Sequence, residues 1–372
     1  MDEKEKQPEP KQMQVIKTER QLLCSRFSPD GTHLVAGGMD AKVHRWTEFE
    51  VELEDNDESK DKKGDQEAVG NKIEWKPLKS LEGHRAWVGA LGFHPTEKRV
   101  FTGDSWGQLR CSDYAGENPK IHWAVDKAHD GWLRQLDVDE QHVVTAGRDR
   151  AVRLWDHSGK RIADWEGPEE VCALAIHPSG KQVVFGDAKG IARVWDFGSK
   201  EITLEFPLTE FFKLSRLQDV CGLTRFIFIE DGKALLAVGC APTDGGNMQG
   251  IPTVDLIDFA SGESRNRIQF GVENDAFITD AAWHPDGYVL CATSGVTACG
   301  STVFVRPDED KPFFTNTKIV NIHSLALHPD NKRFLVTGTN RTSNGNGRRL
   351  NKEGEYEGNN SPIHFFELPS EA

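Results

Sequence analysis

The chain repeats one pattern of apolar and polar positions along most of its length. Two apolar runs, each as long as a short strand, flank a polar turn of about four residues that carries Pro, Asp or Gly in most copies. About ten residues later, most copies reach another β-rich run. Regular strand and turn signals with almost no helical periodicity predict an all-β protein. The seven copies begin at Ser25, Leu91, Leu136, Leu174, Phe226, Ala281 and Leu325.

Short signatures in these copies resemble a known repeat family. Arg-Leu-Trp-Asp at 153–156 and Arg-Val-Trp-Asp at 193–196 end two strand patterns, and Gly83-His84 and Ala128-His129 precede others. This GH…WD combination, in units of roughly 40–45 residues, resembles the WD40 repeat. The resemblance covers nearly the whole chain in seven units. It implies a seven-bladed β-propeller, in which each blade is a four-stranded antiparallel sheet around a central channel.

The chain length and its two ends fit a closed ring. Four stretches fit no unit, and removing them leaves about 44 residues per blade. The last unit ends after its third strand, at 361–368, whereas the strand-like segment 12–17 precedes the first unit. We expect this N-terminal strand to complete the last blade, so that no sheet edge stays unpaired at the seam. Two stacked β-sandwiches are the alternative, which a uniform register across seven units disfavours.

Some stretches are expected to lie outside the regular blades. We expect one propeller over 12–368, after a disordered tail over 1–11. Residues 48–67 hold ten carboxylates and three lysines, which supply −7 of the chain's charge of −14. Such a stretch cannot offset its ordering entropy by burial, so we expect a disordered loop at 50–70 in blade 1. It is either a solvating loop or an acidic docking segment for a basic partner. A polar insertion at 340–361 is expected in blade 7.

Composition narrows the class of protein and its partners. The 372 residues include 59 acidic and 45 basic side chains, a balance that argues against a nucleic-acid or anionic-membrane surface. No apolar run approaches the roughly 20 residues of a membrane span. Seven cysteines without CxxC or CxxxC spacing indicate buried free thiols in a reducing compartment. We expect a cytoplasmic protein, monomeric or part of a hetero-complex, that binds neither nucleic acid nor membrane.

The WD40 resemblance implies a buried polar network, with a His before the first strand, a Ser or Thr on the second, an Asp in the next turn and a Trp on the third. One unit matches all four positions, at His129, Thr145, Asp149 and Trp155. We interpret this set as a structural tetrad and not as a catalytic triad, because the hydroxyl is predicted to be buried between strands. The other units depart from the pattern: Trp106 takes the Asp position beside His84 and Thr102 in unit 2, and Lys189 takes it in unit 4.

Four histidines precede proline in the hairpin turns and invite a metal interpretation. They belong to four different blades, so a propeller spreads them around its rim and a single zinc ion cannot collect them. We therefore interpret them as turn residues and expect no metal site and no cofactor. The four are His94, His177, His284 and His328.

The candidate partner-binding residues lie on the top face, where the fourth-to-first and second-to-third strand connections emerge. Alignment of the units places Trp87 and Trp132 at one equivalent position of adjacent blades, near the channel mouth. Trp and Arg are enriched at energetic hot spots of interfaces. Alternatively, the indoles only seal the channel mouth. The full candidate set is Trp87, Trp106, Trp132, Arg148 and Phe277.

The sequence thus predicts a non-catalytic scaffold that binds other proteins through the top face of the propeller. The alternative is a propeller-fold enzyme or small-ligand binder that uses the channel mouth. Against it, the equivalent position around the mouth carries one ionisable group, Glu170. The apolar stretch 211–214, in a long entry to the fifth unit, either packs locally or meets a partner.

Overall fold

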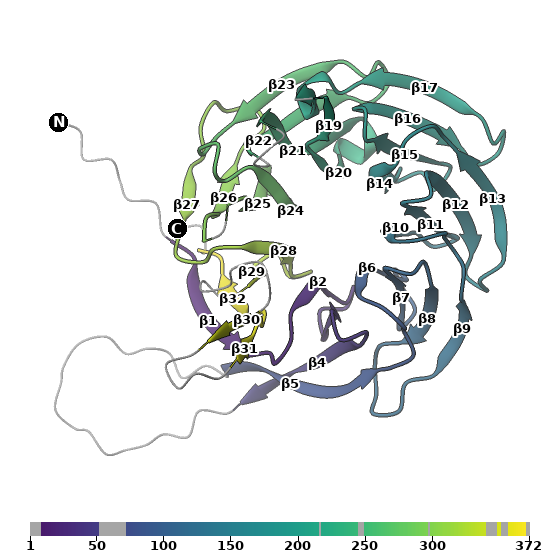
Figure 1. The fold of residues 1–372 in the computed structure, drawn as a ribbon. Helices are drawn as coiled ribbons and strands as arrows, with labels where there is room; N and C mark the ends of the chain where they lie inside the picture. The colour runs from purple at the N-terminus through teal and green to yellow at the C-terminus, as the bar shows by residue number, and fades with distance from the viewer. Residues whose placement is uncertain are drawn as a thin grey trace, which may run out of the picture.

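The computed structural model describes residues 9–51, 72–215, 217–244, 249–296, 298–339, 348–350 and 356–369. Within these residues, seven four-stranded antiparallel sheets are arranged as blades around a central axis (Figure 1). The predicted all-β, seven-bladed propeller is confirmed. Two small hairpins and two 3-10 helices stand outside the blades: β18 (Phe212–Ser215) with β19 (Gln218–Cys221), β30 (Arg348–Leu350) with β31 (Tyr356–Gly358), η1 (Thr209–Phe211) and η2 (Glu230–Gly232).

Each blade consists of consecutive strands, except at the seam of the ring. Blade 1 consists of β2 (Leu22–Phe27), β3 (His33–Gly38), β4 (Val43–Val51) and β5 (Lys72–Leu81). Blade 2 consists of β6 (Val88–Phe93), β7 (Arg99–Asp104), β8 (Leu109–Asp113) and β9 (Ile121–Val125). Blade 3 consists of β10 (Leu133–Val138), β11 (His142–Gly147), β12 (Ala151–Asp156) and β13 (Arg161–Glu166). Blade 4 consists of β14 (Val171–Ile176), β15 (Gln182–Asp187), β16 (Ile191–Asp196) and β17 (Ile202–Pro207). Blade 5 consists of β20 (Leu223–Ile229), β21 (Ala234–Asp244), β22 (Gln249–Asp258) and β23 (Ser264–Gln269). Blade 6 consists of β24 (Phe277–His284), β25 (Tyr288–Ser294), β26 (Thr302–Val305) and β27 (Phe314–Asn316). Blade 7 is β28 (Ile322–Leu327), β29 (Arg333–Gly338), β32 (Ile363–Glu367) and β1 (Lys11–Ile16).

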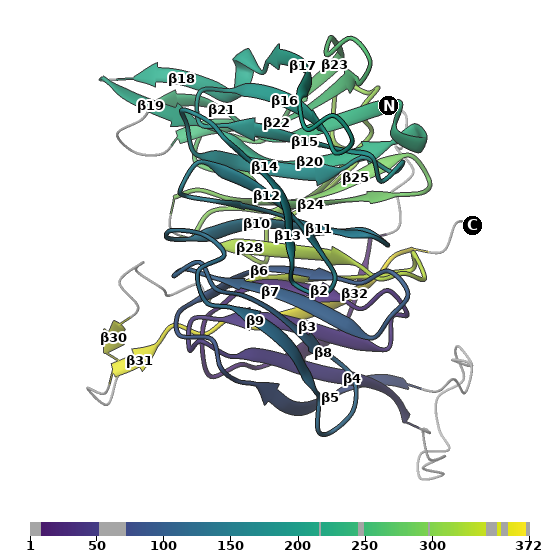
Figure 2. The same ribbon diagram turned by 90° about the vertical axis from the view of Figure 1, so that its right-hand side faces the viewer.

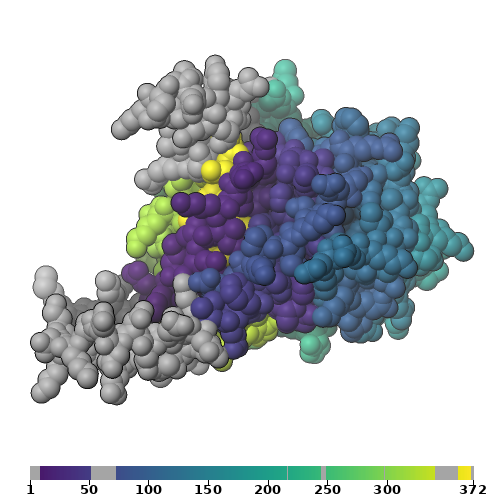
Figure 3. All heavy atoms as spheres, turned by 90° about the horizontal axis from the view of Figure 1, so that it is seen from below, coloured from purple at the N-terminus to yellow at the C-terminus, as the bar shows by residue number. Residues whose placement is uncertain are grey.

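The N-terminal strand closes the ring, as the sequence predicted. Strand β1 pairs antiparallel with β32, with a register that runs from Lys11 opposite Glu367 to Ile16 opposite Ile363. The N-terminal residues, in purple, lie against the C-terminal residues, in yellow, at this seam (Figure 3). The edge of β32, the last strand of the chain, is therefore paired, and blade 7 has its fourth strand.

Most of the expected disordered segments lie outside the described residues. These are 1–8 of the tail, 52–70 of the acidic loop, and 340–347 with 351–355 of the blade 7 insertion. At their edges, β1 already begins at Lys11 and β4 extends to Val51, because both positions pair with a neighbouring strand.

The hydrophobic core lies between the blades. The buried apolar side chains of the described residues form seven clusters, and each joins two neighbouring blades. Trp195 of blade 4, for example, is fully buried in the cluster that blade 4 shares with blade 3. Burial of one such side chain contributes on the order of 2–3 kcal/mol. Each blade therefore buries apolar surface against a neighbour on both of its faces.

The seven cysteines occur as free thiols. Cys24, Cys111, Cys240 and Cys291 are buried within the blades, and the other three are partly buried. Among the described residues, no helix has the length and apolar character to cross a membrane.

The strand order defines two faces of the ring. The connections from fourth to first strand and from second to third strand share one face, the top, because neighbouring strands alternate in direction. Hairpin β18–β19 lies in the β17–β20 connection and hairpin β30–β31 in the β29–β32 connection, so both belong to the top. Both project from the same side of the ring (Figure 2).

Histidines of the His-Pro turns join neighbouring blades at the bottom face. In three of the four turns, the Nε2–H group donates to a backbone carbonyl of the next blade: His177 to Gly232 at 3.2 Å, His284 to Asn331 at 2.8 Å and His328 to Gly31 at 3.1 Å. In each ring the other nitrogen, Nδ1, accepts a backbone N–H two residues later in its own turn. In His177 these two bonds require the neutral ring with its proton on Nε2.

The close approach of these rings explains two glycines. Gly31 and Gly232 have φ of +73° and +88°, and a Cβ added at either would come within 2.6 Å of the histidine ring of the neighbouring blade. The fourth histidine, His94, instead packs edge-on against the ring of His157 in blade 3, with centroids 4.4 Å apart.

Acid should weaken the ring through two of these histidines, His177 and His94. Burial lowers the pKa of His177 and of His94 below the ordinary value of 6.5, so the folded state holds fewer protons than the unfolded chain. The stability that they contribute is present above about pH 6.5 and falls as the pH drops through that value. Urea unfolding at pH 7.5 and pH 5.5 should show a lower free energy of unfolding at pH 5.5. His177→Gln, which can donate to Gly232 but cannot take up a proton, should show a smaller loss; an equal loss would contradict the role of this histidine.

Removal of residues 1–18 should destabilise the whole ring, because it leaves β32 without its outer partner. The lost ladder hydrogen bonds alone predict a fall of about 3 kcal/mol or more in the free energy of unfolding. Removal of residues 1–8 is the matched control, since it leaves β1 whole. Denaturant unfolding and limited proteolysis measure the effect. Equal protease resistance of the two truncated proteins would show that β1 does not hold the ring closed.

Candidate functional site

Three tryptophans gather around one cavity on the top face, where blades 1, 2 and 3 meet. Trp87 lies in the connection between β5 and β6, Trp106 in the β7–β8 turn and Trp132 in the connection between β9 and β10. Together with residues of the β3–β4 turn of blade 1, they line a cavity of about 560 Å³. The other lining residues are Met39, Asp40, Ala41, Arg85, Ala86 and Ser105.

The indoles present apolar surface to solvent. Trp87 is 45% exposed and Trp106 is 66% exposed, which is unusual for such large aromatic side chains. Trp87 packs edge-to-face against Trp132, with ring centroids 6.4 Å apart. The Arg134 guanidinium lies 5.6 Å from the Trp132 ring centroid and pairs with Glu170 at 2.6 Å. Contacts thus hold the Trp87 and Trp132 rings in place, while Trp87 and Trp106 keep exposed surface.

A backbone hydrogen bond that recurs from blade to blade holds these residues at the same position of their blades. The carbonyl of Trp87 accepts the N–H of Ser105 at 2.9 Å, and the carbonyl of Trp132 accepts the N–H of Arg148 at 2.8 Å. Gln21, Glu170, Gly222 and Asn321 accept the same bond in four other blades. In blade 6, Phe277 begins strand β24 instead. The positions that the sequence alignment equated are therefore structurally equivalent in six blades.

A buried carboxylate, Asp104, orders both loops that carry the exposed tryptophans of blade 2. Its Oδ2 atom lies 3.0 Å from Nδ1 of His84 and accepts the N–H of Arg85 at 3.3 Å. Its Oδ1 atom accepts the N–H groups of Trp106 and Gln108, both at 3.0 Å. Burial would raise the pKa of Asp104, but these hydrogen bonds outweigh it and lower the pKa, so the carboxylate stays charged.

Asp104 corrects the sequence alignment of blade 2. The alignment placed Trp106 in the Asp position of the buried network, whereas the partner of His84 stands two residues earlier, at the end of β7. His84 also contacts the Thr102 hydroxyl through Nε2 at 2.7 Å. The His–Thr–Asp part of the network is therefore present in blade 2, and the position that Trp106 occupies is free for an exposed side chain.

The network predicted for blade 3 forms through all four residues. Trp155 donates its indole N–H to Thr145 Oγ1 at 2.9 Å, Thr145 Oγ1 lies 2.8 Å from His129 Nε2, and His129 Nδ1 lies 2.8 Å from Asp149 Oδ1. The order of donors requires a neutral His129 with its proton on Nδ1, and burial lowers the pKa of this imidazole accordingly. Because the Thr145 side chain is fully buried, no substrate can reach its hydroxyl.

Comparison with known proteins agrees with this geometry. The family model of the WD domain, G-beta repeat (WD40) matches residues 11–47, 75–113, 123–156 and 159–196, which are four consecutive repeats. The remaining three blades repeat the same strand pattern in the structure. The chain belongs to the WD40-repeat family.

Several curated proteins resemble part of this WD40 propeller. The pre-mRNA-splicing factor cwf17 of Schizosaccharomyces pombe is 25% identical over 181 residues, which cover 47% of this chain and 45% of the relative. Protein HIR1 of Candida albicans is 29% identical over 153 residues, 35% of this chain and 17% of the relative. A probable coatomer subunit beta' of S. pombe is 21% identical over 150 residues, 38% of this chain and 18% of the relative. The WD40 propeller thus matches less than half the length of each relative, and together they support a protein-interaction scaffold role.

The comparisons contradict the cytoplasmic location that we expected from the sequence. A pre-mRNA-splicing factor is among the matching relatives, and pre-mRNA splicing is a nuclear process. The similarity therefore points to a nucleus, whereas composition and free cysteines indicate only a reducing compartment, a condition that nucleus and cytoplasm share.

The remaining candidate residues of the WD40 propeller lie apart from the tryptophan cavity. Arg148 is exposed in the turn after β11 and does not line it. Phe277 is partly buried in blade 6, three blades beyond blade 3. Lys189 of blade 4 pairs with Asp219 of hairpin β18–β19. In this blade the Asp position of the buried network is filled two residues before Lys189, by Asp187, which pairs with Arg193 at 2.5 Å.

Among the described residues, no group of three or more His, Cys, Asp or Glu side chains is arranged to hold a metal ion. Three of the His-Pro histidines, His177, His284 and His328, are bound to backbone groups through both ring nitrogens, so none of them offers a free nitrogen to a ligand.

Asp104→Ala should loosen the tryptophan cavity as well as the blade. It leaves His84 and three backbone N–H groups without their acceptor, and loss of a buried charged partner costs about 3–5 kcal/mol. We expect a lower free energy of unfolding in urea and a weaker near-ultraviolet circular dichroism signal from the tryptophans. Asp130→Ala removes an exposed acid of the neighbouring blade and should change neither. An unaltered tryptophan signal in Asp104→Ala would refute the ordering role of this carboxylate.

Proposed function

We propose that this WD40 propeller is a non-catalytic scaffold that binds other proteins through its top face, with the tryptophan cavity of blades 1 to 3 as the main contact. The observation that carries the proposal is the exposure of Trp87 and Trp106 beside a cavity of about 560 Å³. Large aromatic side chains that stay exposed on a folded surface are the residues most enriched at energetic hot spots of protein interfaces.

The rigidity of the cavity supports the same proposal. Backbone hydrogen bonds hold the Trp87 and Trp132 carbonyls, and Asp104 holds the turn of Trp106. A partner that docks on prearranged side chains loses less conformational entropy on the protein's side than one that must first order a mobile loop. An aromatic or aliphatic anchor of a partner can therefore bind here at low cost in ordering.

A second exposed apolar element lies on the same face. In hairpin β18–β19, Leu214 is 62% exposed and Leu217 is 96% exposed, while Phe211 just before the hairpin is fully buried. The apolar stretch 211–214 thus divides between local packing and exposure. The Lys189–Asp219 ion pair joins the hairpin to blade 4. We infer that a partner large enough to cover the channel mouth would contact both the hairpin and the tryptophan cavity.

Simultaneous Trp87→Ala and Trp106→Ala should remove partner binding without unfolding the ring. Loss of two hot-spot side chains of at least about 2 kcal/mol each predicts a fall in affinity of more than about 100-fold. Partners isolated with the wild-type protein by affinity purification and mass spectrometry would be produced pure, and their affinity for each variant measured by calorimetry.

The matched control changes two exposed apolar residues on outer strands, Ile121→Ala and Ile162→Ala. This variant should bind as the wild type does. Thermal unfolding of all three proteins checks that the ring is intact. Undiminished affinity of the double tryptophan variant for every partner would overturn the assignment of this face.

A further inference from the structure

The central channel contains a second cavity, separate from the tryptophan cavity. It has a volume of about 350 Å³ and is lined by the first strands of six blades, β2, β10, β14, β20, β24 and β28. The lining residues Phe27, Ile176 and Leu327 stand at or beside the bottom ends of their strands. Ala175, Ala282 and Ala326 leave space at the same level, so the cavity occupies the lower part of the channel.

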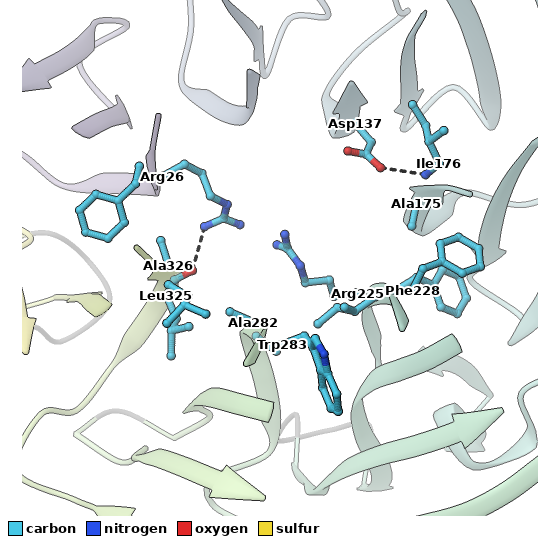
Figure 4. A pocket seen from close by; sticks show the side chains of 15 residues that line it. Arg26, Asp137, Ala175, Ile176, Arg225, Phe228, Ala282, Trp283, Leu325 and Ala326 are labelled. Atoms are coloured by element: carbon cyan, nitrogen blue, oxygen red, sulfur yellow. Dashed lines mark hydrogen bonds between the residues drawn. The ribbon is translucent and has the colours of Figure 1, made fainter. Parts of the chain in front are cut away.

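Three ionisable side chains from different blades, Arg26, Asp137 and Arg225, line this cavity, and a fourth, Asp280, binds both arginines. Arg225 and Asp280 each follow the bulge of their first strand, in β20 and β24. Arg26 and Asp137 stand two residues beyond the equivalent position, in β2 and β10. The guanidinium groups of Arg26 and Arg225 point toward one another across the centre of the cavity, and Asp137 lies on the wall opposite Arg26 (Figure 4).

One carboxylate, Asp280, binds both arginines. Its Oδ2 atom accepts from Arg26 at 2.6 Å and from the N–H of Leu325 at 2.9 Å. Its Oδ1 atom accepts from Arg26 at 3.1 Å, from Arg225 at 2.7 Å and from the N–H of Ala281 at 3.0 Å. The side chain is 4% exposed, so its capacity as an acceptor is filled.

The two arginines differ in how far their donors are used. Arg26 also donates to Ser324 Oγ and to the carbonyls of Ser25 and Leu325. Within the described part of the chain, Arg225 donates only to Asp280 and is 36% exposed. Burial lowers the pKa of Arg225, whereas Asp280 outweighs burial at Arg26 and raises its pKa. Arg225 therefore carries a charge that its surroundings compensate only in part.

Within the described part of the chain, Asp137 forms no hydrogen bond or ion pair with Arg26 or Arg225. Both of its oxygens accept backbone N–H groups, from Val138 at 2.9 Å and Ile176 at 2.8 Å. Burial raises the pKa of this carboxyl, against the effect of the two hydrogen bonds. Arg26, Arg225 and Asp280 together carry a net charge of +1, and the two like charges face the same open space. An anion between them would relieve this repulsion.

We propose that the channel binds a small molecule through a compact oxyanion, a carboxylate or phosphate group, held between the Arg225 and Arg26 guanidinium groups. The planar guanidinium fork matches the spacing of the oxygens in both groups. The exposed fractions of Arg225 and Arg26, 36% and 23%, leave both groups open to solvent. The cavity volume lies at the lower end of the roughly 300–1,000 Å³ of small-molecule sites.

Calorimetric titration of the full-length protein with inorganic phosphate, and separately with citrate, tests the proposal at constant ionic strength with chloride as the balancing anion. We expect saturable one-to-one binding of at least one of these anions, together with a concentration-dependent rise in melting temperature. Arg225→Gln should weaken that binding at least about tenfold, because it removes the uncompensated donor group. Asp280 keeps Arg26 as its partner in this variant, so the ring should stay folded.

The controls separate a channel site from general charge effects. Arg161→Gln removes an exposed arginine of outer strand β13 and should bind the anion as the wild type does. Arg225→Lys keeps the charge but not the fork and should fall between wild type and Arg225→Gln. It also serves as the test if Arg225→Gln does not fold. Absence of saturable binding of both anions, or equal binding by wild type and the Arg225 variants, would overturn the proposal. The double tryptophan variant should bind the anion normally, so this result is independent of the top-face assignment.

Discussion

The pairing of β1 with β32 is the constraint on which the rest of the propeller depends. The apolar core is divided among seven clusters between neighbouring blades, and a blade without a neighbour would expose one whole apolar face. The cluster between blades 7 and 1 contains Ile363 and Phe365 of β32 together with Phe27 and Trp46 of blade 1. Antiparallel pairing from Lys11 to Ile16 places both ends of the chain in one sheet, so the seam becomes an ordinary inter-blade contact. At three of the contacts between neighbouring blades, a hydrogen bond from a histidine of a bottom turn adds to the apolar packing.

How far the sequence could predict this protein depends on whether a feature repeats. The fold, the blade count and the closing strand follow from a strand-and-turn pattern that recurs seven times, and a single weak copy does not disturb it. The geometry of one site does not recur. Asp104 escaped the alignment because a histidine ring can reach a carboxylate at the end of a strand as well as one in the following turn. Only the folded chain shows which of the two positions is used.

The cluster of charged residues in the central channel was not predicted from the sequence, for a related reason. Arg26, Arg225 and Asp280 belong to three blades and lie up to 254 residues apart. The sequence did contain a signal. Each of these charged residues stands in a first strand, at a position where the other blades mostly have a small or apolar residue, such as Ala90, Ala173 and Ala326. A comparison of the inner positions of all first strands, instead of the strand starts alone, would have brought these charges together. The expected cytoplasmic location failed for a different reason, because composition describes the chemistry of a compartment and not its identity.

The unequal blades connect stability with the proposed docking site. A propeller of identical blades would present the same surface around its rim, and a partner could not select one orientation. Here the His–Thr–Asp network is present in blades 2 and 3, the blades that carry Trp87, Trp106 and Trp132. In blade 4, Phe185 takes the position of the hydroxyl, and the buried Trp195 indole N–H has no acceptor among the described residues. The network therefore orders top-face loops where exposed aromatic groups must be held in place, and it is incomplete in a blade whose top surface carries none of the three tryptophans. Degeneration of the repeat leaves one sector of the ring both rigid and apolar, and this combination is what a specific protein contact requires.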